Sequence, residues 1–241
     1  MDKKLKKLFG YLYFTLFINI FFPKRCIICG KYGLFLCGKC VKNVVIFRTP
    51  VCFYCGKITK YGESCSSCKK IHNSSLDGII YSSSFNEGNT KEIIHYLKYN
   101  GIIELSTILS AIVLERIKNK LPKGKIVVVP VPMFIKKERS RGFNQSELIA
   151  REVSMFLGLH GGLGLKKVRS TSSQAESSRE TRMKNIKNSF VCDDVELIKD
   201  KTVLLIDDIV TTGSTLEECA QTLKNSGAKR VYGVVIASAK Y

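Results

Sequence analysis

The chain has 241 residues, and its 39 lysine and arginine residues against 20 aspartate and glutamate residues give a formal net charge of +19 at pH 7. A hydrophobic fraction of 45% and a charged fraction of 24% are those of a globular protein, and they exclude a chain disordered throughout, a collagen-like chain and a polytopic membrane protein. The length predicts one or two domains. The positive charge is explained either by a lysine-rich solvated surface or by a partner that carries phosphate groups.

The first 25 residues join a lysine-rich start to an apolar run over residues 8–22. This pattern resembles the start of a signal peptide, but no small-residue cleavage site follows the run, which is also shorter than the roughly 20 residues that span a bilayer. We therefore expect a buried or amphipathic leading helix over residues 1–25. The alternative is a helix on a membrane surface, where residues 8–22 and the flanking lysines would contact anionic lipid.

Eight of the ten cysteines form four C-x-x-C pairs within a short segment. The pairs are Cys26/Cys29, Cys37/Cys40, Cys52/Cys55 and Cys65/Cys68. Because each pair offers two thiolates from one tight turn, two pairs complete the tetrahedral shell of a structural Zn²⁺ ion. The spacing predicts a double zinc ribbon over residues 26–72 with two sequential sites, and it leaves open a cross-braced pairing of the same cysteines.

The cysteines also bear on the compartment. A disulfide framework would need an oxidising compartment, and the lack of a cleavage site after residue 22 favours a reducing one. We therefore expect the protein to be cytoplasmic. The two cysteines outside the cluster, Cys192 and Cys219, are expected to be apolar filling.

After a polar joint at residues 72–75, predicted strands and helices alternate along the chain. Strands are expected at residues 78–85, 125–129, 203–206 and 231–237, and helices at residues 90–99, 104–121, 144–157 and 215–225. Asn144 is a suitable N-cap for the third helix, and Gly158 is a suitable stop. This alternation predicts an α/β domain with a mainly parallel sheet over residues 76–241.

The most informative segment covers residues 203–215. An apolar run ends in the adjacent carboxylates Asp207 and Asp208, and a loop rich in hydroxyl groups and glycine then leads into a helix. The loop and the helix start offer N–H groups to a phosphate monoester, and we expect Ser214 and Glu217 to form a capping box there. The carboxylates suit sugar hydroxyls or a Mg²⁺ ion at the carboxyl end of a strand. The segment therefore predicts a site for a phosphorylated ribose.

This segment resembles the phosphoribosyl-pyrophosphate signature of type I phosphoribosyltransferases. Together with the double zinc ribbon, further motifs make the chain similar to the ComF family over nearly its whole length. They are Ile94-His95-Tyr96-Leu97-Lys98-Tyr99, Pro130-Val131-Pro132, Arg141-Gly142-Phe143-Asn144-Gln145, Arg169 with Gln174, and Arg182 with Asn185. The resemblance implies a type I phosphoribosyltransferase-like α/β domain preceded by a small cysteine-rich double zinc ribbon.

The resemblance also implies roles for individual residues in binding phosphoribosyl pyrophosphate with Mg²⁺. Asp207 and Asp208 would hold the ribose 2′- and 3′-hydroxyls and contact Mg²⁺ through water, and Arg141 would join them in catalysis by neutralising pyrophosphate. The implied phosphoribosyl pyrophosphate-binding residues are Val131, Pro132, Arg139, Asp207, Asp208, Thr211, Thr212, Gly213, Ser214 and Thr215. Residues 166–187 would form a mobile loop that closes over the ligand.

At the level of function, the resemblance implies action in the cytoplasmic steps of DNA uptake during natural transformation. The implied partners are phosphoribosyl pyrophosphate, single-stranded DNA, and a DNA-uptake helicase or recombination proteins. Two alternatives stay open, namely a metabolic phosphoribosyltransferase with a nucleobase or amine acceptor, and a binding-only regulator. Pentosyl transfer to an acceptor is the activity that would distinguish an enzyme from a regulator.

Overall fold

The computed structural model describes residues 23–118, 121–171 and 185–241. The chain forms two compact units, which divide after Asn43. The first unit contains the first cysteine cluster and the short helix α2 (Gly38–Val41), and the second contains the second cysteine cluster and the sheet. Residues 1–22, where the leading helix is expected, lie outside the described residues. Within the described part, no helix is long and apolar enough to cross a membrane.

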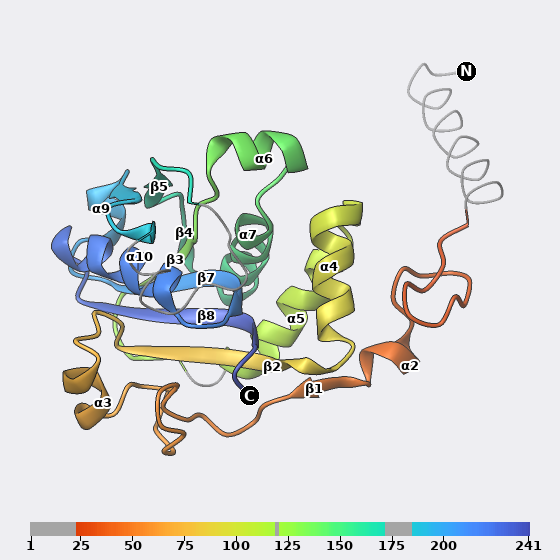
Figure 1. Cartoon of the computed structure of the whole chain (residues 1–241), viewed down its shortest axis with the longest axis horizontal. Helices are drawn as coiled ribbons and strands as arrows, with labels where there is room; N and C mark the ends of the chain where they lie inside the picture. Colours follow the sequence, from red (N-terminus) through yellow and green to blue (C-terminus); the bar gives the residue numbers. More distant parts are fainter. Residues whose placement is uncertain (1–22, 119–120, 172–184) are drawn as a thin grey trace. The chain divides into compact units, whose positions relative to one another are not determined.

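A six-stranded sheet forms the centre of the second unit (Figure 1). In spatial order its strands are β1 (Val44–Ile46), β2 (Gly78–Gly88), β8 (Arg230–Ser238), β7 (Thr202–Val210), β3 (Ile126–Pro130) and β4 (His160–Gly161). Of these six strands, β1 alone runs antiparallel to its neighbour, and the other four pairings are parallel. The predicted mainly parallel α/β sheet is therefore confirmed.

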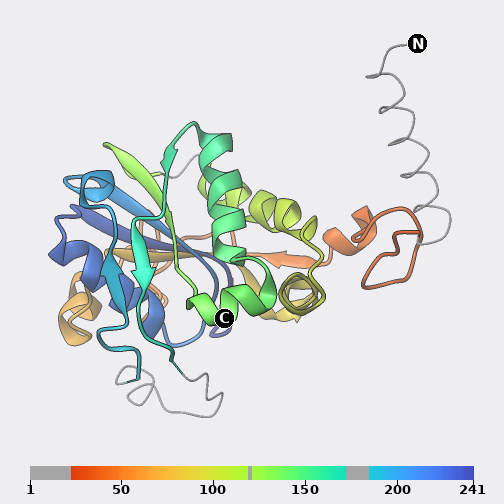
Figure 2. The ribbon, with the colours of Figure 1, turned by 90° about the horizontal axis from the view of Figure 1, so that it is seen from above.

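Helices cover both faces of this sheet (Figures 1 and 2). On one face lie α4 (Thr90–Asn100), α5 (Leu105–Ile117) and α7 (Gln145–Leu157), and on the other lies α10 (Ser214–Asn225). Alternate β7 residues such as Val203 and Leu205 form one buried cluster with α10. Cys219 is fully buried in this cluster and Cys192 packs against it, which confirms their prediction as apolar filling.

Several shorter elements connect these layers, and the sequence patterns did not predict them. They are α3 (Ser66–Ile71), α6 (Ile135–Arg141), α9 (Val195–Ile198) and the antiparallel pair β5 (Leu165–Lys167) and β6 (Phe190–Cys192). These runs are too short to show a clear hydrophobic period, which explains why periodicity did not reveal them.

The long elements occur where the sequence predicts them, with three notable differences in length. Strand β2 ends at Gly88 rather than at residue 85. Strand β7 continues past its predicted end at residue 206, because its pairing with β8 extends to Val210 opposite Ser238. Helix α5 ends at Ile117 rather than at residue 121, in keeping with Pro122, which disfavours helical geometry at the residue before it. At α7, the Asn144 side chain accepts a hydrogen bond from the Ser146 N–H at 3.0 Å, so the predicted N-cap is confirmed.

Asp77 joins three separate parts of the second unit. Its carboxylate pairs with Lys69 of α3 at 2.8 Å and with Lys224 of α10 at 2.7 Å, and it accepts a hydrogen bond from the Val231 N–H of β8 at 2.8 Å. Burial alone would raise the pKa of the Asp77 carboxyl, but the bonds from Lys224, Lys69 and Val231 together lower it. The ionised carboxylate is therefore stabilised by folding.

We expect Asp77→Asn to lower the free energy of unfolding at pH 7 by about 2 kcal/mol, because the amide leaves a buried N–H and two ammonium groups without their anionic partner. The loss should be the same at pH 5 and pH 7, since a carboxyl with a lowered folded-state pKa gives up its contribution only below its unfolded value of about 4. Urea unfolding at both pH values measures it. Asp193→Asn, at an exposed aspartate, is the control, and equal stability of Asp77→Asn and wild type would contradict the assignment.

Candidate functional site

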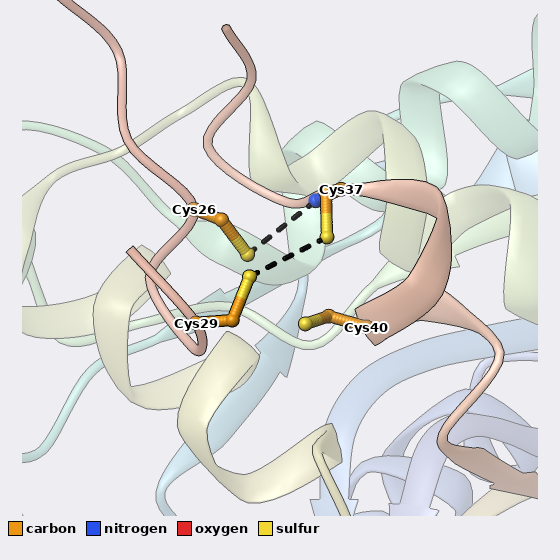
Figure 3. A group of neighbouring side chains, drawn as sticks. All are labelled: Cys26, Cys29, Cys37 and Cys40. Atoms are coloured by element: carbon orange, nitrogen blue, oxygen red, sulfur yellow. Dashed lines mark hydrogen bonds between the residues drawn. The ribbon is translucent and has the colours of Figure 1, made fainter. Parts of the chain in front are cut away.

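The first cysteine cluster has the geometry of a tetrahedral metal site (Figure 3). The sulfur atoms of Cys26, Cys29, Cys37 and Cys40 all lie within 4.8 Å of one another, and those of Cys29 and Cys37 are 3.7 Å apart. Four thiolates at about 2.3 Å from a Zn²⁺ ion would have their sulfurs about 3.8 Å apart. The backbone N–H of Cys37 points at the Cys26 sulfur over 3.5 Å, as expected beside a metal-bound thiolate.

The second cluster repeats this arrangement with Cys52, Cys55, Cys65 and Cys68, whose sulfurs again lie within 4.8 Å of one another. The sulfurs of Cys55 and Cys65 are 3.8 Å apart, and the Cys65 N–H lies 3.5 Å from the Cys52 sulfur. Each cluster is built from two consecutive C-x-x-C pairs. The sequential pairing is therefore confirmed, and the cross-braced alternative is wrong.

A glycine closes the first turn of each cluster. Gly30 and Gly56 adopt φ values of +73° and +77°, and their N–H groups donate to the carbonyl oxygens of Cys26 and Cys52 at 2.9 and 2.8 Å. Glycine takes such positive φ values without the steric strain that a side chain would add. The glycines thus allow the two cysteine sulfur atoms of each first pair to face the same metal position.

The thiols of each cluster do not ionise independently. Although burial raises it, hydrogen bonds from the backbone of Cys29 and Cys37 and their neighbours lower the pKa of Cys26 to about 6. Burial and the neighbouring thiols raise the pKa of Cys40 to about 12. The second cluster shows the same contrast, with a pKa of about 7 for Cys52 and about 12 for Cys68. Four thiolates in one cluster therefore need a bound cation, and the all-sulfur tetrahedral set fits Zn²⁺.

We expect the purified protein to contain two Zn²⁺ ions per chain. Cys29→Ser and Cys55→Ser should each lower the content to one, since each removes one of four ligands from a separate site. Elemental analysis after gel filtration measures the stoichiometry. A single zinc per wild-type chain, or loss of both ions from either variant, would contradict two independent sites.

A second group of polar residues lies at the carboxyl end of β7. Strand β3 ends at Pro130 opposite Ile206, whereas β7 continues along β8 and carries Asp207 and Asp208 beyond that point. The first turn of α7 contacts both carboxylates there. Ser146 donates its hydroxyl hydrogen to Asp207 Oδ1 at 3.0 Å, and the Gln145 side-chain amide donates to Asp208 Oδ2 at 2.6 Å.

Cations complete this group around Asp208. The ammonium group of Lys98, in the last turn of α4, lies 2.7 Å from Asp208 Oδ2, and both side chains are largely buried. Arg141 donates to the other end of the Gln145 amide at 2.6 Å, and its guanidinium lies 5.6 Å from the centre of the Tyr99 ring. The chain of contacts Arg141–Gln145–Asp208–Lys98 therefore joins α4 and α6 to the end of β7.

The loop after β7 leads directly into α10. Gly213 is the N-cap of α10 with φ +80°, and the hydroxyl groups of Thr212 and Ser214 lie 2.8 Å apart. The predicted capping box of Ser214 and Glu217 is wrong. Because Gly213 takes the N-cap position, Ser214 is already the first helical residue, and Glu217 instead accepts hydrogen bonds from the Ser74 hydroxyl at 2.7 Å and from the Ser75 N–H.

The other predicted site residues lie in the segment after β3. Val131 is buried, and its carbonyl accepts a hydrogen bond from the Asn144 side chain at 3.1 Å. Pro132 follows it and is half-buried. In α6, Arg141 reaches the carboxylates through Gln145, whereas Arg139 is exposed and has no described contact with them. Most of the expected mobile loop, residues 172–184, lies outside the described residues.

Three further residues at this site were given no role of their own by the sequence reasoning. Lys98, Gln145 and Ser146 contact the carboxylates directly. Lys167 of β5, which falls in the expected mobile loop, is half-buried, and burial lowers the pKa of its ammonium group while the negative charge of Asp207 offsets part of this. Lys98 and Gln145 belong to two of the motifs that carry the family resemblance, and this membership was the one sign in the sequence that they could act at the site. Their sequence separation from Asp208 hides the contact itself.

The folded structure disfavours the ionised form of the Asp207 carboxyl. Burial, and next the negative charge of Asp208, raise the pKa of Asp207 to about 7, and the bonds from the Asp208 N–H and Ser146 offset only part of this. An aspartate in an unfolded chain has a pKa of about 3.9. The raised pKa therefore lowers the free energy of unfolding at every pH at which Asp207 is ionised in the unfolded chain.

We expect Asp207→Asn, without added Mg²⁺ or ligand, to be more stable than wild type, with a gain of about 1–2 kcal/mol at pH 8 and a smaller gain at pH 5.5. The wild type loses stability as pH rises from about 4 to about 7, because the folded carboxyl keeps its proton while the unfolded one is ionised. The amide oxygen of the variant can still accept hydrogen bonds from the Ser146 hydroxyl and from the Asp208 N–H. Thermal unfolding at the two pH values checks this, and a gain that does not change with pH would contradict the raised pKa.

Comparison with known proteins agrees with both parts of this description. Residues 104–240, more than half of the chain, match the family described as phosphoribosyl transferase domain. Residues 17–69 match the family described as double zinc ribbon domain.

Three curated proteins illustrate the similarity. Competence protein F of Haemophilus influenzae is 28% identical over 230 residues, which cover 88% of this chain and 95% of that protein. DNA utilization protein YhgH of Escherichia coli K12 is 32% identical over 148 residues, which cover 58% of this chain and 63% of that protein. Competence protein ComFC of Bacillus subtilis is 22% identical over 202 residues, which cover 80% of this chain and 79% of that protein. The chain therefore belongs to the phosphoribosyl transferase domain family, and it is a homologue of competence protein F and ComFC with a double zinc ribbon ahead of that domain.

Proposed function

We propose that this chain binds phosphoribosyl pyrophosphate with Mg²⁺ at the end of β7. The observation that carries the proposal is that the carboxylates Asp207 and Asp208 lie in the same strand end that opens into the loop at residues 211–215 and the start of α10. Carboxylates suit ribose hydroxyls and Mg²⁺, and a small-residue loop at the start of a helix suits a phosphate. Groups that suit the sugar and groups that suit the phosphate thus lie within nine consecutive residues, 207–215.

Each part of the ligand has residues that suit it. Asp207 and Asp208 would hold the ribose hydroxyls, with Mg²⁺ contacted through water. The 5′-phosphate would be held by Thr211, Thr212, Gly213, Ser214 and Thr215. The pyrophosphate would lie toward Val131 and Pro132, where Arg141, fixed by Gln145, and the exposed Arg139 supply positive charge.

Lys98 is a further residue that should influence ligand binding at Asp208. Because Asp208 already pairs with the Lys98 ammonium at 2.7 Å, a ligand hydroxyl or cation that binds Asp208 must share it with Lys98 or displace it. A displaced lysine at this position would stay beside the polyphosphate and compensate its negative charge. We therefore add Lys98 to the residues expected to influence affinity.

If the chain catalyses transfer, the reaction is displacement of pyrophosphate from the ribose C1 by an acceptor. Bound Mg²⁺ would stabilise charge on the leaving pyrophosphate. The chain's own part would be to orient the ribose through Asp207 and Asp208, and to place Arg141 near the leaving group. Turnover with a nucleobase or amine would make the protein a metabolic phosphoribosyltransferase, whereas binding without turnover would make it a regulator.

In the cell, we propose a role in the use of incoming DNA in the cytoplasm. Homologues carry the names competence protein and DNA utilization protein, and the alignment with competence protein F covers most of both chains. Single-stranded DNA and the helicase or recombination proteins that handle it are the proposed partners. The net charge of +19 supports contact with a polyphosphate chain, and such binding should weaken strongly as salt concentration rises.

The first test is calorimetric titration of the zinc-loaded protein with Mg²⁺ and phosphoribosyl pyrophosphate. We expect binding by wild type and at least a tenfold loss in Asp207→Asn/Asp208→Asn, because the variant keeps the size of both side chains but loses both negative charges. Asp193→Asn/Asp194→Asn, also adjacent aspartates, is the matched control and should bind as wild type does. No binding by a folded wild type, or equal binding by the double variant, would contradict the assigned site.

A screen for pyrophosphate release then separates enzyme from regulator. Release that requires a particular nucleobase or amine would identify a transferase and its acceptor. Tight binding with no release for any acceptor would support the regulator.

A further inference from the structure

The loop proposed to hold the phosphate lies against the second zinc ribbon. Phe53, between the zinc ligands Cys52 and Cys55, is 3% exposed and belongs to the main buried cluster. A Cβ atom placed on Gly213 would lie 3.7 Å from the Phe53 ring and 3.7 Å from the Ile79 side chain. The N-cap of α10 therefore lies beside a side chain that the zinc-binding turn carries.

A second contact joins the ribbon to the first turns of α10. Glu217 accepts hydrogen bonds from the Ser74 hydroxyl at 2.7 Å and from the Ser75 N–H, both just after α3, the helix that carries Cys68. The Tyr54 hydroxyl also bonds Ser74 at 3.1 Å. The first turn of the second ribbon thus lies beside this helix start through Phe53, and the segment just after α3 bonds it through Ser74 and Ser75.

A third contact fixes the backbone of the same zinc-binding turn. The Lys240 ammonium donates to the carbonyl oxygens of Phe53 and Tyr54 at 2.8 and 2.7 Å, and the Tyr241 hydroxyl donates to Phe53 O at 3.1 Å. Lys240 and Tyr241 follow β8, the strand that pairs with β7. The turn at residues 52–55 is thereby held between the sheet and the loop at residues 211–215.

The first ribbon provides a natural comparison. It has the same ligand spacing at its first pair, but Ile27 and Ile28 stand where the second ribbon has Phe53 and Tyr54. It belongs to the other compact unit. The aromatic pair is therefore a feature of the second ribbon and not of the first, and Phe53 is the member that lies beside Gly213.

We propose that the second zinc ribbon positions the phosphate loop, with Phe53 and Glu217 as positioning residues, so that Zn²⁺ at Cys52, Cys55, Cys65 and Cys68 and the phosphate at residues 211–215 strengthen each other's binding. The inference rests on the proposed function of this loop. Loss of zinc would free the turn that carries Phe53 and the end of α3 before Ser74, and the loop would then have to be ordered by the ligand alone. Because coupling between two sites is reciprocal, bound ligand must in turn slow the loss of this zinc ion.

The affinity arm of the test uses Mg²⁺ with phosphoribosyl pyrophosphate on the full chain. We expect Cys55→Ser to weaken binding at least tenfold, while Cys29→Ser, the same change in the first ribbon, changes it less than twofold. Glu217→Gln, which keeps all zinc ligands, should weaken binding three- to tenfold. Glu218→Gln is its matched control, since Glu218 bonds the Asn188 N–H instead of the ribbon.

The zinc arm has a readout that does not depend on activity. A chelator is added to the full chain, and zinc release is followed by a coloured indicator with and without the ligand. We expect the ligand to slow one of the two release phases in wild type and the single release phase that remains in Cys29→Ser. The single phase that remains in Cys55→Ser should not change. In Glu217→Gln the slowing should be reduced.

The outcomes separate this inference from the function on which it rests. If folded, zinc-loaded wild type binds no phosphoribosyl pyrophosphate, both fail. If wild type binds but Glu217→Gln binds equally well and the ligand slows no zinc release, the ligand site stands and the coupling is wrong. Equal weakening by Cys29→Ser and Cys55→Ser would also overturn it. Should Cys55→Ser fail to fold, the Glu217→Gln affinity and the wild-type release rates still decide the question.

Discussion

The arrangement of the candidate site depends on one difference in strand length. Strand β7 pairs with β8 as far as Val210, while β3 on its other side ends at Pro130. Beyond that point the β3 side of β7 is open to the first turn of α7, which supplies Gln145 and Ser146 to the carboxylates. Had β3 continued, its backbone would occupy the place of these side chains. The contacts of Asp207 and Asp208 with α7 follow from this early end of β3, whereas Lys98 reaches Asp208 from α4.

The two zinc ribbons show how one chelating unit can serve two structural surroundings. Their ligand spacing, glycine turns and N–H to sulfur contacts are nearly the same, because tetrahedral sulfur coordination dictates them. The residues between the ligands are free of that requirement and differ. Isoleucines stand in the first ribbon, whereas the aromatic pair of the second packs with Tyr81, His72 and the residues after β8. Metal geometry thus sets the backbone of each ribbon, and the intervening side chains set what surrounds it.

Much of this architecture could be predicted from local sequence patterns, and the exceptions have physical reasons. The cysteine spacing predicted two sequential four-thiolate sites, because chelation by adjacent pairs is a short-range property. The apolar runs predicted the main strands and helices. The length of β7 was underestimated because Asp207 and Asp208 interrupt the apolar run, although the β8 backbone still pairs with it. The capping box failed because Gly213 took the N-cap position. Lys98 and Gln145 were not assigned because their contacts with Asp208 depend on tertiary packing, which no local pattern records.

The place of β8 in the sheet has a consequence for how the chain folds as it is synthesised. β8 is the last of the described strands in sequence, yet it is central in the sheet, pairing with β2 on one side and β7 on the other. Its Val231 N–H donates to the carboxylate of Asp77, 154 residues earlier. The ribosome must therefore deliver every residue up to the end of β8 before this sheet can close, and contacts between such distant residues form slowly. The first cysteine cluster, by contrast, can capture its metal as soon as residues 26–40 emerge. Metal capture by the first ribbon can thus precede closure of the sheet, which waits for β8.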